Sequence, residues 1–334
     1  MRAARVHGPG DLRVDEVRDP QPGPGEVVLR IEAAATCGTD VKSVRDGHPS
    51  LGPYPARLGH EFAGVVERIG AGVTGVAEGD EVFCADSAPC GACRQCLRGR
   101  ESLCEDLLYL LGGFAEKLLV PRRVVERNLH LLPHNVPLAL APLAEPLACA
   151  VHALDVVEVP ERVTILGAGS LGCMLAALAA SKGARPLVLD PHPERLRVAA
   201  RFGARTAIAT KGPEDLQHRA DLVIEAVGRP EAWEQAVALA APGGTVNLFG
   251  GCARGTTFTV PAARVHYEEV TITGTYHHAP RYIAEALRIL AETSYPWEDL
   301  LGPSISLDQL PDALAGRLHD PPPAKYAVNT RAAP

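Results

Sequence analysis

A glycine-rich turn between an apolar strand and an apolar helix constrains the fold of this chain most strongly. Gly167, Gly169 and Gly172 follow the predicted strand 162–166 and lead into the predicted helix 173–181. The first glycine permits a tight turn, the second lets a pyrophosphate approach the backbone, and the third lets helix and strand pack closely. Phosphates then lie at the helix N-terminus, next to Ser170 and Leu171. The pattern predicts a dinucleotide-binding βαβ unit.

An acidic residue follows at the distance expected for ribose recognition. The predicted strand 187–190 ends in Asp190, 18 residues past Gly172. A carboxylate here accepts hydrogen bonds from both ribose hydroxyls of NAD and repels the extra phosphate of NADP, so we expect NAD as the cofactor. Arg195, one helical turn further on, could contact the ribose or could equally be a solvated helix charge.

Strand-like segments recur through the rest of this half of the chain. They are 206–209, 221–227, 245–249 and 270–276, with helical patterns at 147–157 and 230–241. Alternating β and α segments imply an α/β fold with a doubly wound parallel sheet.

The first 145 residues have a different sequence pattern. Short β-like runs are separated by glycine and proline clusters, and these runs are 27–32, 61–69, 81–84 and 115–120. Many short strands broken by such turns predict a compact barrel-like β domain. The tail has helical patterns at 281–292 and 307–318 and a final strand at 325–329.

Four cysteines lie close together in the first half, at positions Cys90, Cys93, Cys96 and Cys104. Four cysteine thiolates this close in sequence suit a closed tetrahedral zinc site, and the bound zinc would stabilise a polar loop. Disulfides are disfavoured in a reducing compartment, and the bacterial iron–sulfur pattern places its fourth cysteine sooner and before a proline. We therefore expect structural zinc.

A second set of metal-ligating residue types is spread over the same half. His60 and Glu61 are adjacent, Cys37 lies upstream, and Glu145 stands before a proline. Catalytic zinc takes three protein ligands of these types and leaves a position for water or substrate.

Composition restricts the possible partners. The chain has 334 residues, is 46% hydrophobic and has a formal net charge of -7. This charge disfavours non-specific binding to nucleic acid or to an anionic membrane. No apolar run reaches the roughly 18–20 residues that span a bilayer, and the N-terminus lacks the pattern of a signal peptide, so we expect a cytoplasmic protein.

Taken together, these motifs resemble those of the zinc-containing medium-chain dehydrogenases, in the branch of sorbitol, threonine and other polyol or amino-alcohol dehydrogenases. The resemblance spans nearly the whole chain and includes the sequence from Lys325 to Asn329. It implies a GroES-like catalytic domain (1–146 and 277–334, with the zinc lobe at about 88–106) and a Rossmann domain (147–276). A homodimer or homotetramer is implied as well.

The resemblance also implies roles for individual residues. Cys37 and His60 match the ligands of the catalytic zinc, and Glu61 and Glu145 match carboxylates that bind the metal directly or through water. Thr39 matches a hydroxyl that relays the substrate proton. Asp40 matches an acid that orients the zinc-bound histidine. Two zinc ions per chain are implied, one catalytic and one structural, with NAD as the hydride acceptor.

The chain departs from the sorbitol enzymes near the substrate. Ser43 replaces a tyrosine and His277 replaces an arginine, so Lys42, His48 and His278 are further candidates for the pocket lining. These differences favour another polyol, a cyclitol or an amino alcohol, oxidised at a secondary hydroxyl to the ketone. Two alternatives remain open, a primary alcohol or aldehyde dehydrogenase of the same family and a non-catalytic nucleotide-binding relative.

Overall fold

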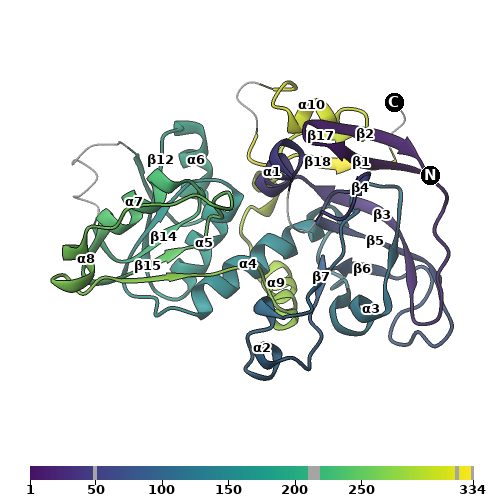
Figure 1. The fold of residues 1–334 in the computed structure, drawn as a ribbon, viewed down its shortest axis with the longest axis horizontal. Helices are drawn as coiled ribbons and strands as arrows, with labels where there is room; N and C mark the ends of the chain where they lie inside the picture. Colours follow the sequence, from purple (N-terminus) through teal and green to yellow (C-terminus); the bar gives the residue numbers. More distant parts are fainter. Residues whose placement is uncertain (48–50, 210–218, 320–322, 332–334) are drawn as a thin grey trace. The chain divides into compact units, whose positions relative to one another are not determined.

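The computed structural model describes residues 1–47, 51–209, 219–319 and 323–331 (Figure 1). The chain divides into two compact units. Unit 1 comprises Met1–Ala148, His278–Thr293 and Leu301–Pro334, and unit 2 comprises Cys149–His277 and Ser294–Leu300. The segment Ser294–Leu300, expected in the first domain, therefore clusters with the second unit.

Unit 2 contains a six-stranded sheet with the order β13-β12-β11-β14-β15-β16, and every pair in it is parallel. The strands are β11 (Arg162–Leu166), β12 (Arg185–Asp190), β13 (Arg205–Ile208), β14 (Ala220–Glu225), β15 (Ala240–Leu248) and β16 (Thr271–Gly274). Counted from β11, this is the order 3-2-1-4-5-6 of a Rossmann sheet. The prediction of a doubly wound parallel sheet is confirmed.

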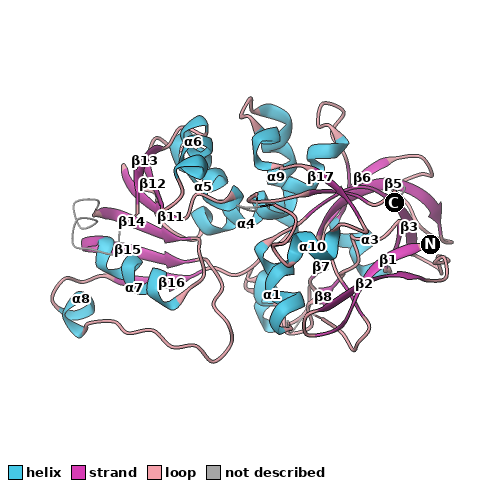
Figure 2. Cartoon of the chain, turned by 90° about the horizontal axis from the view of Figure 1, so that it is seen from above, coloured by secondary structure: helices cyan, strands magenta, loops and turns pink. Residues whose placement is uncertain are grey.

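Helices cover both faces of this sheet (Figure 2). In that view α5 (Ser170–Ser181) and α6 (Pro193–Arg201) lie on one side, and α7 (Pro230–Leu239) lies on the other. Because both faces are covered, the central strands are apolar along their length and not in alternation. Ile165, Val188 and Val223 are completely buried, for example. A short helix, α8 (Ala262–His266), precedes the edge strand β16.

Unit 1 is built mainly from antiparallel strands. Its largest sheet has the order β10-β6-β5-β3-β18-β17, with β9 also paired to β3. A three-stranded sheet, β2-β1-β4, and a two-stranded sheet, β7-β8, complete it. The first sheet comprises β3 (Val27–Ala35), β5 (Glu61–Ile69), β6 (Glu81–Cys84), β9 (Lys117–Val120), β10 (Leu129–Leu131), β17 (Ser304–Ser306) and β18 (Ala327–Asn329). The others comprise β1 (Arg2–Gly8), β2 (Asp11–Glu16), β4 (Ala56–Arg57), β7 (Ser87–Ala88) and β8 (Leu108–Tyr109).

Unit 1 also contains helices of 4 to 13 residues. They are α1 (Gly38–Asp46), α2 (Arg94–Leu97), α3 (Arg122–Asn128), α9 (Pro280–Glu292) and α10 (Leu310–Leu314). Helix α4 (Ala144–Asp155) begins in unit 1 and ends in unit 2. The window Leu138–Asp155 is long and apolar enough to cross a membrane, but 72% of it is buried inside the protein, as in a core helix.

A hydrophobic core lies in unit 1, with Phe62, Phe114 and Leu29 among its fully buried members. The C-terminal strand β18 pairs with the end of β3, where Ala327 faces Ala35 and Val328 faces Ala34. This pairing brings the segment before β18 next to the residues that follow β3. Distant parts of the sequence therefore meet near Thr36 and Cys37.

Candidate active site

Cys37, His60 and Glu61 converge in unit 1. Cys37 is the residue before helix α1, and Glu61 is the first residue of β5. Gly59 turns the chain into β5 with φ of +93°, and a Cβ at this position would lie 2.7 Å from the Phe114 nitrogen, so only glycine fits. Each of the three residues offers one ligand atom, and these atoms lie within 4.8 Å of one another. Sulfur, imidazole nitrogen and carboxylate oxygen form a donor set that suits zinc.

Asp40 orients two members of this set. It is 1% exposed and lies in the first turn of α1. One of its oxygens accepts a hydrogen bond from the Cys37 backbone N–H at 2.8 Å, and the other accepts one from His60 Nδ1 at 3.1 Å. Because Nδ1 carries the proton, Nε2 is the ring atom left to bind a metal.

Charge within the set prepares the thiol for metal binding. Burial would raise the pKa of Cys37, but the positive charge of Lys325 and a hydrogen bond with His60 lower it to about 7. Burial would also lower the pKa of His60, whereas the charge of Asp40 and its hydrogen bond raise it on balance. A metal ion binds the thiolate form of cysteine, so the lowered pKa favours loading at neutral pH.

Lys325 is the residue of this site whose role the sequence did not predict. Its Nζ donates to both carboxylate oxygens of Glu61 at 2.5 Å and to the Thr36 carbonyl at 3.0 Å. The side chains of Lys325 and Glu61 are 2% and 0% exposed. Burial would lower the pKa of Lys325, but the charge of Glu61 raises it. The only signal was that Lys325 opens a sequence segment typical of the family.

Glu145 belongs to a neighbouring group and not to the compact set of three. It lies in the first turn of α4, where His278 and Asp86 approach it. Burial raises its pKa, and the charge of Asp86 adds to this effect, while His60 and His278 oppose it. The charge of Glu145 also raises the pKa of Glu61, so the Asp86, Glu145 and His278 group is a neighbour of the Cys37, His60 and Glu61 set.

The remaining predicted pocket residues lie in different places. Thr39 is half-buried in the first turn of α1, Lys42 is half-buried, and Ser43 is buried in the same helix. His48 lies outside the described residues. His277 belongs to unit 2, where it has φ of +59° and its carbonyl accepts a hydrogen bond from His152 Nδ1 at 2.7 Å. Such a backbone conformation is uncommon for a side chain of this size.

The four clustered cysteines form a second donor set in unit 1. Their Sγ atoms are 3.5 Å apart for Cys93–Cys96, 3.9 Å for Cys93–Cys104 and 4.0 Å for Cys90–Cys96. Tetrahedral zinc with Zn–S bonds of about 2.3 Å requires sulfur separations of about 3.8 Å. Hydrogen bonds from the backbone N–H groups of Cys96 and Glu105 lower the pKa of Cys93 to about 6. The geometry fits one zinc ion.

In unit 2, the glycine turn has the shape that a pyrophosphate requires. Gly167 has φ of +102°, and a Cβ on Gly172 would lie 1.9 Å from the Gly167 carbonyl oxygen. A Cβ on Gly169 would meet no atom within 4 Å, so this side of the turn is open. Gly169 precedes α5, whose first turn contains Ser170 and Leu171. The turn therefore presents backbone N–H groups at a helix N-terminus, where phosphate binds.

Asp190 ends β12 and supports this turn. One carboxylate oxygen accepts a hydrogen bond from the Ala168 backbone N–H at 2.8 Å, and the other accepts one from the His192 backbone N–H at 2.9 Å. Asp190 is 4% exposed. Each carboxylate oxygen has a second lone pair, so ribose hydroxyls can still be accepted. Arg195 lies in the first turn of α6 and is half-buried.

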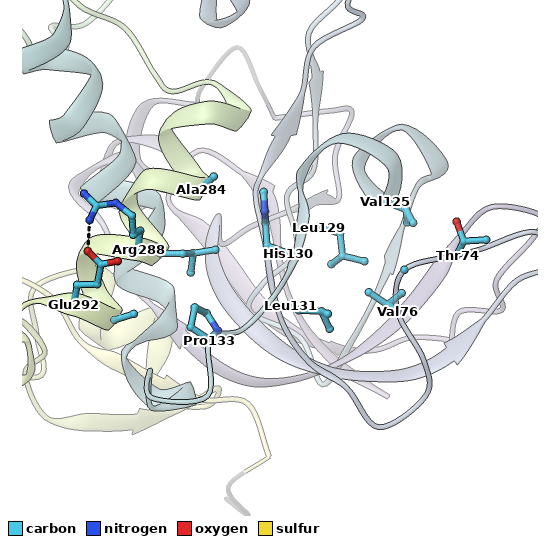
Figure 3. A pocket seen from close by; sticks show the side chains of 13 residues that line it. Thr74, Val76, Val125, Leu129, His130, Leu131, Pro133, Ala284, Arg288 and Glu292 are labelled. Atoms are coloured by element: carbon cyan, nitrogen blue, oxygen red, sulfur yellow. Dashed lines mark hydrogen bonds and ion pairs between the residues drawn. The ribbon is translucent and has the colours of Figure 1, made fainter.

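A cavity of about 630 Å³ lies elsewhere in unit 1 (Figure 3). Apolar side chains such as Val76, Leu129 and Leu287 line it, together with His130 and the ion-paired Arg288. None of the predicted metal ligands contributes to its wall.

Comparison with known families agrees with the motifs. Residues 23–132 match the alcohol dehydrogenase GroES-like domain, and residues 170–292 match the zinc-binding dehydrogenase domain. The L-threonine 3-dehydrogenase of Deinococcus radiodurans is 35% identical over 268 residues, which are 75% of this chain and 76% of that protein.

This chain belongs to the zinc-binding alcohol dehydrogenase family. The D-altritol 5-dehydrogenase of Agrobacterium fabrum is 33% identical over 281 residues, which are 80% of this dehydrogenase and 81% of that protein. The resemblance to the polyol and threonine branch is confirmed, and so is the combination of a GroES-like domain with a Rossmann domain. The dehydrogenase is an enzyme, so the non-catalytic alternative is not retained.

Solved structures agree over the whole length. A zinc-binding dehydrogenase from Sinorhizobium meliloti 1021, bound to NADP, has a TM-score of 0.89 and 28% identity over 98% of this chain and 99% of that one. Galactitol-1-phosphate dehydrogenase from Escherichia coli has a TM-score of 0.87 and 26% identity over 99% of this chain and 100% of that one. The dehydrogenase is thus a zinc-type alcohol oxidoreductase.

Proposed function

We propose that this dehydrogenase oxidises a secondary alcohol (a polyol, a cyclitol or an amino alcohol) to the ketone, with NAD as the hydride acceptor. The convergence of Cys37, His60 and Glu61 within 4.8 Å carries the proposal. These residues come from two motifs that are 23 positions apart in the sequence. A half-buried thiol beside a buried imidazole and a buried carboxylate is a donor set of the kind that catalytic zinc uses.

The metal would be held by the Cys37 thiolate and His60 Nε2, with Glu61 and Glu145 bound directly or through water. When bound, zinc acts as a Lewis acid that lowers the pKa of a substrate hydroxyl. Asp40 fixes the ring of His60 through Nδ1, and Lys325 fixes Glu61 through both oxygens. The four-cysteine lobe would hold a second, structural zinc, so we propose two zinc ions per chain.

The proton of the alcohol would leave through a side chain of the protein. The hydroxyl of Thr39 lies two residues from Cys37, in the first turn of α1, and its half-buried position allows contact with both the site and water. A hydroxyl can accept a proton on one side and donate one on the other, as a relay requires. Thr39 is therefore the proposed relay.

NAD is proposed over NADP because of Asp190. The carboxylate ends β12 directly beside the glycine turn, where a 2′-phosphate would be repelled. Arg195 in α6 has the opposite charge, and it is a candidate contact for the ribose. The neighbour from Sinorhizobium meliloti is bound to NADP, so a protein of this fold can also accept the phosphorylated cofactor. The preference for NAD or NADP is therefore proposed to depend on side chains such as Asp190 and Arg195.

The substrate class follows from the relatives and from Glu145. Threonine, altritol and galactitol 1-phosphate are named as substrates of the similar enzymes, and each carries a secondary hydroxyl beside another polar group. In the resemblance, a glutamate at Glu145 is typical of the polyol branch, whereas classical alcohol dehydrogenases have cysteine. We therefore place a polyol-type substrate ahead of a simple primary alcohol.

A cytoplasmic homodimer or homotetramer is the proposed state. The strand β16 forms one edge of the parallel sheet and, within the described residues, pairs on one side with β15. Tyr267, which precedes it, is 82% exposed. An open edge strand with an exposed aromatic neighbour can add a second sheet.

A substrate and cofactor panel tests the proposal. Zinc-loaded enzyme is assayed with polyols, cyclitols, amino alcohols and primary alcohols, each with NAD and NADP. We expect turnover of secondary alcohols, ketone products and a preference for NAD. Turnover confined to primary alcohols would overturn the substrate assignment.

Two variants test the residues. Cys37→Ser should remove one zinc per chain and abolish turnover, while the four-cysteine zinc stays; an active variant with unchanged zinc content would refute the catalytic site. Asp190→Ala should shift the preference towards NADP, and an unchanged ratio of kcat/KM for the two cofactors would remove Asp190 from ribose recognition. His192→Ala is a control, because only its backbone contacts Asp190.

A further inference from the structure

Asp86, Glu145 and His278 form a compact group in unit 1, next to the Cys37 set. Asp86 follows β6, Glu145 lies in α4, and His278 lies shortly before α9. His278 Nε2 donates to Asp86 Oδ1 at 2.8 Å and lies 3.8 Å from Glu145 Oε1. The His278 side chain is fully buried, and both carboxylates are 7% exposed. Three separate segments thus bring potential ligands to one buried point.

The spacing of these atoms fits a metal ion. In a tetrahedral site with bonds of about 2.0–2.1 Å, ligand atoms are separated by about 3.3–3.4 Å. The two separations in this group, 2.8 Å and 3.8 Å, lie on either side of that value. One ligand atom from each of the three residues falls within 4.8 Å of the others. Small side-chain shifts would therefore place all three around one ion.

The chemistry of the group also suits a cation. Asp86 and Glu145 are buried carboxylates on either side of the fully buried imidazole of His278. Buried carboxylates are stabilised by a metal ion that they coordinate, and a neutral imidazole can be the third ligand.

We propose that Asp86, Glu145 and His278 bind a second divalent cation beside the catalytic zinc. A carboxylate has two oxygens, so Glu145 can bind the catalytic zinc with one and the second ion with the other. This sharing of Glu145 rests on the proposed function, which places a catalytic zinc at the Cys37 set. Two carboxylates and an imidazole, without a thiolate, suit Mn²⁺, Fe²⁺ or Zn²⁺. The second ion would orient a substrate with two adjacent oxygen atoms, such as a polyol.

Metal analysis of the full-length enzyme tests this inference. Zinc per chain is first measured on the zinc-loaded protein, which is then titrated with Mn²⁺ while free Mn²⁺ is followed by electron paramagnetic resonance. Mn²⁺ is the weakest competitor in the divalent series, so it leaves zinc in the thiolate sites. We expect either about three zinc ions per chain, or about two zinc ions with about one bound Mn²⁺.

The double variant Asp86→Asn with His278→Gln should lose this additional ion and keep the other two. Asparagine and glutamine are similar in size to the residues that they replace, and they can keep a hydrogen bond with each other. If circular dichroism shows that the double variant does not fold, His278→Gln alone is used instead. Asp312→Asn with His319→Gln, both exposed, is the matched control and should bind as the parent does.

The outcomes separate this inference from the proposed function. Two zinc ions and no bound Mn²⁺ in the parent would overturn the second site, and so would unchanged binding in the double variant; His278 would then only hold the two carboxylates. Loss of one zinc and of turnover in Cys37→Ser would leave the catalytic zinc standing in that case. An active Cys37→Ser enzyme with full zinc would refute the catalytic site instead.

Discussion

The ion pair between Lys325 and Glu61 allows a quantitative test of the site. Both side chains are essentially inaccessible to solvent, and the ammonium contacts both carboxylate oxygens. Lys325→Met removes the ammonium, keeps most of the volume and leaves a carboxylate buried without its cation. Removal of one partner from a buried pair costs about 3–5 kcal/mol, because the remaining charge is desolvated and uncompensated.

The expected loss can be measured by thermal unfolding in the presence of a chelator, so that no metal compensates Glu61. For a unit of this size, about 3–5 kcal/mol corresponds to a decrease in Tm of roughly 6–20 °C. Adding Glu61→Gln to Lys325→Met should restore much of the stability, because the unpaired charge is then gone. Metal-free parent protein is the reference for each variant.

Lys117 provides the matched control. Its Nζ bridges Asp19 at 2.7 Å and Glu67 at 2.8 Å, but these side chains are 23–41% exposed. Exposed pairs contribute up to about 1 kcal/mol, so Lys117→Met should have a small effect. If Lys325→Met costs no more than Lys117→Met, or if Glu61→Gln does not rescue it, the reasoning about the buried pair is refuted.

Three further predictions follow from other features. Cys93→Ser should lower Tm markedly while the folded fraction keeps its turnover, because the lobe zinc contributes folding energy; normal melting without turnover would contradict a structural role. Gly172→Ala should abolish dinucleotide binding in titration calorimetry and lower stability, because its Cβ would lie 1.9 Å from the Gly167 oxygen. Burial, with the charge of His278, lowers the pKa of His130 from 6.5 to about 4. The unfolded state therefore binds a proton that the folded state does not, and stability falls as pH decreases from about 6.5 towards 4, by up to about 3 kcal/mol. His130→Gln should flatten this part of the urea-unfolding profile, and an unchanged pH dependence would show that His130 is not responsible.

Elements with a strong local pattern were predictable from the sequence. The bounds of β5 (Glu61–Ile69) and β11 (Arg162–Leu166) agree with the predicted ranges, because apolar runs end there at turn residues. Helix α10 (Leu310–Leu314) is shorter than the predicted 307–318, and β15 (Ala240–Leu248) begins before the predicted 245. The pairing between β14 and β15 shifts register between Ala220 and Leu222 of β14, and no local sequence pattern predicts this shift.

The candidate site was predictable only where its residues belong to compact motifs. Cys37, His60 and Glu61 were selected by residue type and resemblance, and they do converge. Asp40 was predicted as the partner of His60, and it contacts the ring. The distant pairs were not predicted, since Lys325 is 264 positions from Glu61 and His278 is 192 positions from Asp86. Such pairs depend on the path of the whole chain, which spacing within a motif does not encode.

The return of the chain at β18 has a consequence for biosynthesis. Thr36 and Glu61 are synthesised well before Lys325, the lysine that neutralises the glutamate, which lies 289 positions after Thr36. Until Lys325 has been synthesised, the carboxylate of Glu61 lacks the lysine with which it pairs in unit 1. The buried pair can therefore form only after Lys325 has been synthesised, so the site cannot reach its final packing while the first motifs alone are available.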